Sequence, residues 1–128
     1  MRPTYACAYY TRAGIYLQLD EYQPARDDYT AYLTMVSAGS ASAFNAYIGR
    51  AIAENRAGDQ QAALADNNRA IALSPNSPLG YNNRGQVYVD FGDFDAARAD
   101  WTTAAALYRA QGQPQEAVRL EQAMSQLP

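Results

Sequence analysis

Residues 78–111 read PLGYNNRGQVYVDFGDFDAARADWTTAAALYRAQ, and residues 44–77, FNAYIGRAIAENRAGDQQAALADNNRAIALSPNS, follow the same pattern. Residues 6–39 fit it too, at a spacing of 38 instead of 34. The pairs that recur at the spacing of 34 are Tyr47 and Tyr81, Arg50 and Arg84, Gly58 and Gly92, Asp59 and Asp93, Ala63 and Ala97, Asp66 and Asp100, and Ala70 and Ala104. Self-similarity at this period is typical of stacked helical hairpins.

Glycine and proline mark where the helices begin and end. Gly58 and Gly92 suit the left-handed residue that ends a helix, and the aspartate after each can cap the next helix. Pro78 and Pro114 suit a first helical position, where a missing N–H has no cost. The pattern predicts helices over about 4–19, 22–37, 42–57, 60–73, 78–91, 94–110 and 114–126.

The spaced residues of the third unit resemble the tetratricopeptide repeat, W-x2-L-G-x2-Y followed by A-x3-F and P. Those that carry the resemblance are Tyr81, Gly85, Tyr88, Ala97, Trp101 and Ala104, with Pro75 closing the unit before. The resemblance extends over nearly the whole chain. It implies one all-α domain over 1–128, a right-handed superhelical solenoid of antiparallel helix pairs. Its repeats would span about 6–39, 44–77 and 78–111, followed by a capping helix at about 114–126.

Two units depart from this pattern. The first has four additional residues and closes with the proline-free segment 36–40, so its second helix either runs on for a turn or ends in a loop. The middle unit has polar residues where the third has aromatic ones: Glu54 for Tyr88, Gln60 for Phe94, and Asn67 for Trp101. These residues form a hydrogen-bonded cluster, or belong to a more exposed repeat, or contact a ligand.

Three arginine–aspartate pairs recur at a fixed offset of 16 residues. The offset puts each pair on facing helices of one hairpin, and the planar guanidinium can bind a carboxylate through two bonds. We expect structural ion pairs that fix helix registry, while an alternative is that the arginines bind acidic ligand groups. The pairs are Arg12–Asp28, Arg50–Asp66 and Arg84–Asp100.

The composition argues against catalysis and against several kinds of partner. The chain has no histidine and its ten basic residues are all arginine, so the commonest general base, the commonest metal ligand and Schiff-base chemistry are absent. We therefore expect no enzyme, cofactor or metal site. The net charge of -3 disfavours nucleic acid, and no apolar run is long enough for membrane insertion. The lone Cys7 is expected to be a small core residue. A cytoplasmic location is the default expectation, with a trimmed signal peptide left open.

In tetratricopeptide-repeat proteins the first helix of each pair lines a concave groove. The resemblance implies a scaffold or adaptor that binds a peptide or helix of a partner protein there. Asparagine and glutamine can serve a peptide backbone as donor and acceptor. Because lysine is absent, a chaperone's acidic C-terminus is not the expected ligand. The groove residues implied are Tyr10, Leu17, Asn45, Ile48, Ile52, Asn55, Arg56, Asn82, Asn83, Gln86 and Asp90.

A second hypothesis is a structural module that assembles with copies of itself. Tyr5, Tyr9 and Tyr16 lie on the first predicted helix, with no helix before it to cover them. An uncapped apolar end of a solenoid favours association, here as a homodimer.

Overall fold

The computed structural model describes residues 3–128, which form seven α-helices and no strand. The helix bounds agree with the predicted ones to within two residues. The all-α solenoid predicted from the sequence is therefore confirmed. The helices are α1 (Pro3–Gln18), α2 (Tyr22–Met35), α3 (Ala41–Arg56), α4 (Gln60–Leu73), α5 (Pro78–Asp90), α6 (Phe94–Ala110) and α7 (Pro114–Ser125).

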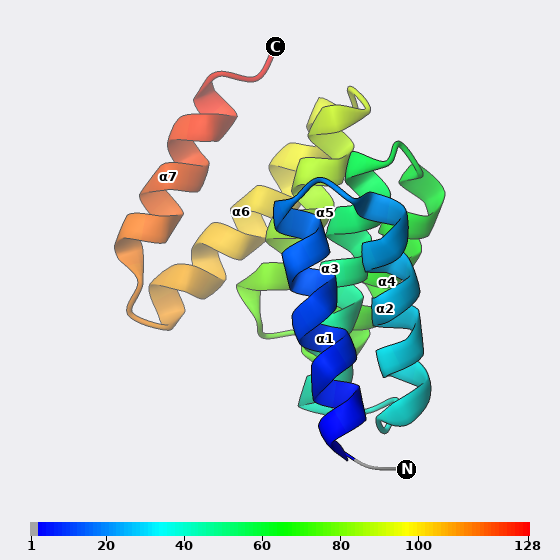
Figure 1. The fold of residues 1–128 in the computed structure, drawn as a ribbon. Helices are drawn as coiled ribbons and strands as arrows, with labels where there is room; N and C mark the ends of the chain where they lie inside the picture. The colour runs from blue at the N-terminus through cyan, green and yellow to red at the C-terminus, as the bar shows by residue number, and fades with distance from the viewer. Residues whose placement is uncertain (1–2) are drawn as a thin grey trace.

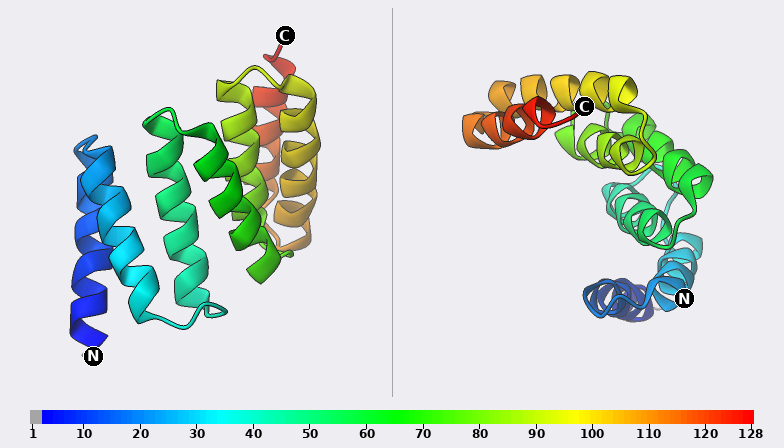
Figure 2. Two further views of the ribbon diagram at one scale, coloured as in Figure 1. Left: turned by 90° about the vertical axis from the view of Figure 1, so that its right-hand side faces the viewer. Right: turned by 90° about the horizontal axis from the view of Figure 1, so that it is seen from above.

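The helices stack as antiparallel hairpins in chain order (Figure 1). Each helix packs mainly against the one before and the one after it. Seen from above, the stack follows an arc whose inner side is formed by α1, α3, α5 and α7 (Figure 2). The even-numbered helices form the outer side. The first helix of every hairpin therefore faces a concave surface.

The turn inside each hairpin requires one residue with positive φ. Gly58 and Gly92 adopt φ values of 85° and 83°, and the side chains of Asp59 and Asp93 each accept an N–H from the next helix. Asp20 takes the glycine position in the first hairpin, with φ 58°. Aspartate tolerates this conformation better than most residues, so the turn keeps its shape without glycine.

Small residues occupy the crossing of the two helices in each hairpin. Ala13 and Ala25 in the first hairpin and Ala63 and Ala97 in the other two are completely buried. In the third hairpin a Cβ atom on Gly85 would lie 2.4 Å from Cδ1 of Trp101. The indole ring thus packs directly on the α5 backbone, which is possible only because Gly85 has no side chain.

Two apolar clusters lie at opposite ends of the stack. The N-terminal cluster contains Tyr29 and Tyr32, and the C-terminal cluster contains Trp101 and Tyr108. Between them the middle hairpin buries three polar side chains, Glu54, Asp66 and Asn67. Of the alternatives raised by the sequence, a more exposed repeat does not describe these positions.

The first hairpin differs from the pattern at its end and near its start. Helix α2 stops at Met35, so the additional residues form a loop rather than another helical turn. The prediction that Cys7 is a core residue is wrong, because its side chain is exposed on α1. Two large side chains of α1, Tyr5 and Ile15, are exposed as well.

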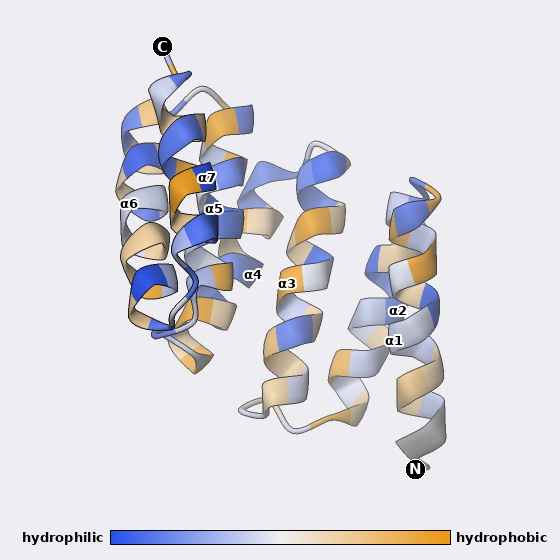
Figure 3. Cartoon of the chain, turned by 90° about the vertical axis from the view of Figure 1, so that its left-hand side faces the viewer, coloured by the Kyte–Doolittle hydropathy of each residue, from blue (hydrophilic) through white to orange (hydrophobic). Residues whose placement is uncertain are grey.

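Hydrophilic and hydrophobic residues alternate along the helices, as Figure 3 shows. Within the described part of the chain, every helix is too short or too polar to cross a lipid bilayer.

The glycine–indole contact gives a direct test of the packing. Gly85→Ala should destabilise the fold by about 1–3 kcal/mol, because the new methyl group collides with a ring confined between two helices. Gly14→Ala is the matched control, since nothing lies within 4 Å of the place its Cβ atom would take and alanine favours a helix by up to about 1 kcal/mol. Urea unfolding of both variants measures the difference. Equal stability of the two would contradict the packing described.

Candidate functional site

The structure brings together each of the three arginine–aspartate pairs. Both bonds of each fork are short: 2.6 and 2.8 Å for Arg12–Asp28, 2.7 and 2.7 Å for Arg50–Asp66, and 2.8 and 2.7 Å for Arg84–Asp100. All three aspartates are buried. Each guanidinium also lies 5.4–5.8 Å from the ring centre of a tyrosine on its own helix. Each aspartate thus joins the two helices of its hairpin through two bonds to one arginine, the arrangement expected of a structural ion pair.

Removing the arginine of the Arg84–Asp100 pair should measure how much this ion pair contributes to the free energy of unfolding. Arg84→Met leaves the carboxylate of Asp100, 8% exposed, without either of its bonds, and should cost about 3 kcal/mol of unfolding free energy. Arg119→Met, on an exposed pair with Glu116, should cost no more than about 1 kcal/mol. Chemical denaturation measures both. A similar small loss in the two variants would contradict a structural role for the buried pair.

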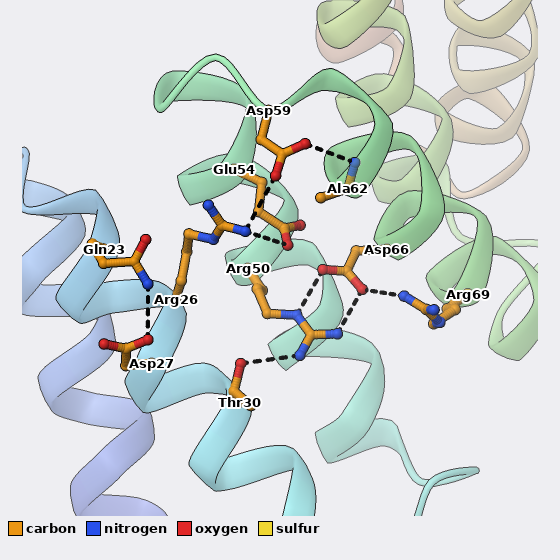
Figure 4. Close-up of polar contacts among 10 residues, drawn as sticks. All are labelled: Gln23, Arg26, Asp27, Thr30, Arg50, Glu54, Asp59, Ala62, Asp66 and Arg69. Carbon is orange, nitrogen blue, oxygen red and sulfur yellow. Dashed lines mark hydrogen bonds and ion pairs between the residues drawn. The ribbon is translucent and has the colours of Figure 1, made fainter.

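The middle hairpin extends its ion pair into a network (Figure 4). Asp66 accepts a third bond from Arg69 at 2.7 Å, and Arg50 donates to the hydroxyl of Thr30 on α2 at 3.1 Å. Burial alone would raise the pKa of Asp66, but hydrogen bonds from Arg50, Glu54 and Arg69 outweigh it and lower that pKa. Asp66 is therefore ionised at neutral pH.

Glu54 lies beside this network but is poorly paired. Its nearest cation is Arg26, at 3.8 Å, and Arg26 lies closer to Asp59, at 3.3 Å. Oε1 of Glu54 is buried and has no hydrogen-bond partner among the described residues. Burial, followed by the hydrogen bond with Asp66 and its charge, raises the pKa of Glu54 to about 8. Arg50 and Arg26 oppose this shift without cancelling it, so Glu54 is mainly protonated at neutral pH.

This shift predicts a pH-dependent stability. The folded pKa of Glu54 lies above its ordinary value of 4.5, so its contribution is complete at low pH and is lost as pH rises through about 8. We expect Tm to fall by about 5 °C or more between pH 6 and pH 9. Glu54→Gln, which imitates the protonated acid, should flatten this profile. A wild-type Tm that stays constant across the interval would contradict the assignment.

A cavity of about 340 Å³ lies between α3 and α5, and Asn67 of α4 also lines it. Both α3 and α5 belong to the inner side of the arc (Figure 2). Its walls combine aliphatic and amide side chains, and its two charged residues have opposite signs. The lining residues are Ala51, Ile52, Asn55, Arg56, Asn67, Asn83, Gln86, Val87 and Asp90.

Hydrogen bonds join the two walls of this cavity. Asn55 on α3 donates to Oδ2 of Asp90 on α5 at 2.8 Å, and Gln86 donates to the other oxygen at 2.9 Å. The carboxylate of Asp90 thus accepts a hydrogen bond from an amide on each of its two oxygens. Oδ1 of Asn55 is buried and has no hydrogen-bond partner in the described chain.

Of the eleven groove residues implied by the sequence, six line this cavity and five lie elsewhere. Asn82 points to α6, where its amide contacts the hydroxyl of Tyr108 at 3.5 Å. Tyr10 packs on Tyr29 and Tyr32, and Leu17 packs against the N-terminal cluster. Asn45 is exposed and Ile48 half-buried, both outside the cavity lining.

The implied groove left out three lining residues, Ala51, Val87 and Asn67, and of these Asn67 is the polar one. It belongs to α4, on the outer side of the arc, and yet it lines the cavity. The replacement of an aromatic residue by asparagine at this place was the available signal in the sequence.

The N-terminal aromatic face carries a second, more apolar cavity. It has a volume of about 430 Å³ and is lined by Tyr5, Ala8, Tyr9, Arg12 and Met35. Tyr5 is 56% exposed, whereas Tyr9 and Tyr16 are half-buried.

Comparison with known proteins agrees with the repeat and the fold. Residues 80–100 match the tetratricopeptide-repeat family model. The solenoid superposes on PcrH, known from Pseudomonas aeruginosa, in complex with the chaperone binding region of PopB, at 19% identity, TM-score 0.82 and 97% coverage of both chains. It also superposes on the TPR2B domain of yeast Sti1 in complex with pHsp70, at 18% identity and TM-score 0.84, covering 95% of this chain and 94% of that one.

A third similar structure is the first tetratricopeptide-repeat domain of Spaghetti (RPAP3) bound to the HSP90 peptide SRMEEVD. Its identity is 21%, its TM-score 0.74, and the match covers 98% of this chain and 97% of the other. No curated protein sequence matches the chain. The chain thus contains a tetratricopeptide repeat and has the fold of tetratricopeptide-repeat domains. The resemblance predicted from its sequence is confirmed.

Proposed function

We propose that this protein is an adaptor that binds an extended segment of a partner protein in the cavity between α3 and α5. The observation that carries the proposal is the lining of that cavity, where four side-chain amides face the same space as Ile52 and Val87. Amides can serve both the N–H and the C=O groups of a peptide, and the aliphatic residues can cover its side chains.

The solved structures of the same fold support this kind of partner. PcrH, the Sti1 domain and the RPAP3 domain were each determined with a segment of a protein partner. The cavity of this chain has one arginine and no lysine, and its one aspartate already accepts hydrogen bonds from two amides. A ligand that is mainly uncharged fits these groups better than a strongly acidic one.

The chemistry of the site supports binding rather than catalysis. The lining side chains are amides, aliphatic groups, one guanidinium and one carboxylate, none of which is paired as a nucleophile with a base. The three buried aspartates outside the cavity are paired with arginines within the hairpins.

A phage-displayed library of unstructured 12-residue peptides, selected on the wild-type protein, tests the proposal without a known partner. A selected peptide should lose about 0.5–1.5 kcal/mol of binding free energy with Asn55→Ala and with Gln86→Ala, because each variant removes one polar contact. Gln122→Ala on α7 is the control and should leave the affinity unchanged. Isothermal titration calorimetry measures all three.

The second hypothesis predicts a different result. If the selected peptides ignored Asn55 and Gln86 but were lost with Tyr5→Ala, the N-terminal face would be the interface. Dimers seen by light scattering that disappear with the same variant would favour self-assembly over the adaptor.

A further inference from the structure

The three hairpins place different residues at one equivalent position of their second helix. The flanking hairpins have Tyr29 and Trp101 there, both large and buried. Trp101 also donates its indole N–H to the backbone carbonyl of Asn82, at 3.1 Å. The middle hairpin has Asn67, which is much smaller and has no ring to fill the space beside the crossing.

The side-chain amide of Asn67 forms no hydrogen bond with the described part of the protein. Its exposed fraction is 0%, and neither Nδ2 nor Oδ1 has a hydrogen-bond partner among the described residues. A buried amide without partners is costly, and an apolar side chain of similar size would stabilise the fold. Hydrogen bonding within the chain therefore gives no reason for an amide here.

The amide of Asn67 lines the floor of the cavity, with Ala51, Ile52 and Val87 among the residues around it. Above it, the bond from Asn55 to Asp90 joins α3 to α5 at the rim. Both residues of this bond also line the cavity, and an exposed hydrogen bond opens at little cost. A group that entered between them would meet a donor and an acceptor at the floor.

We propose that Asn67 is the anchor for an amide group of the bound polypeptide, its Oδ1 accepting that group's N–H and its Nδ2 donating to that group's C=O. This assignment rests on the proposed function. A charged group would be desolvated beside the fully buried Asn67, whereas the two charged lining residues, Arg56 and Asp90, are exposed. An amide matches both free atoms of Asn67 and needs no counter-charge.

The experiment uses a peptide selected on the wild-type protein from the 12-residue phage library. Asn67→Leu should weaken its binding at least tenfold, the equivalent of losing about 1.4 kcal/mol, and should leave Tm unchanged or raise it. Asn67→Ala should weaken binding to a similar degree even if the leucine variant packs poorly. Asn76→Leu, the same chemical change in the exposed loop between α4 and α5, is the control for affinity.

The outcomes separate this assignment from the proposed function. Ile52→Asp, on the cavity wall, should abolish binding if the peptide occupies the cavity. Loss with Ile52→Asp but binding within twofold of wild type for both Asn67 variants would overturn the anchor alone. Binding that also survives Ile52→Asp, or a library that yields no peptide, would overturn the anchor and the proposed function together.

Changes in the peptide identify the source of the amide, either a main-chain peptide unit or an Asn or Gln side chain. Each peptide bond is N-methylated in turn, and each Asn or Gln is separately replaced by Leu or Met. The change that weakens binding to wild type but not to Asn67→Leu marks the group that Asn67 contacts. If every such change acted equally on both proteins, Asn67 would not be the anchor.

Discussion

The whole stack depends on the close crossing of two helices at a pair of small residues in each hairpin. Ala13, Ala63 and Ala97 are among the residues buried at these crossings, and Gly85 leaves its backbone open to a ring. Close approach brings the arginine of one helix within reach of the aspartate on the next, so the fork-shaped ion pairs follow from it. It also fixes the space beside each crossing, which a large residue must fill.

The middle hairpin keeps the crossing but not the large residue. Asn67 stands in place of an aromatic ring and lines the cavity between α3 and α5. With Glu54 in place of a tyrosine, a carboxyl group is buried beside Asp66 and is retained by holding its proton. Burying a polar side chain costs free energy that burying an aromatic ring does not. Both residues belong to the middle hairpin, whose helix α3 forms one wall of the cavity. Local loss of stability of this kind is typical of functional sites.

The sequence predicts the fold well because the pattern for each helix of a hairpin recurs three times along the chain. Its turns, caps and prolines place every helix end to within two residues. The candidate site follows less completely, because it depends on helix phase and on packing. Asn82 and Asn83 are adjacent, yet only Asn83 lines the cavity, since neighbouring residues on a helix diverge by about 100°. Asn67 belongs to an outer helix and reaches the cavity only because no ring covers it.

The polar middle hairpin also bears on how the array behaves as a mechanical unit. In a solenoid each repeat contacts only its neighbours. The N-terminal and C-terminal apolar clusters are therefore connected only through the packing of the middle hairpin. That hairpin buries Glu54, Asp66 and Asn67, whereas the two ends bury aromatic rings. A polypeptide segment bound on the inner side of the arc would contact more than one hairpin at once. It would thereby add contacts between hairpins to those that the chain makes itself.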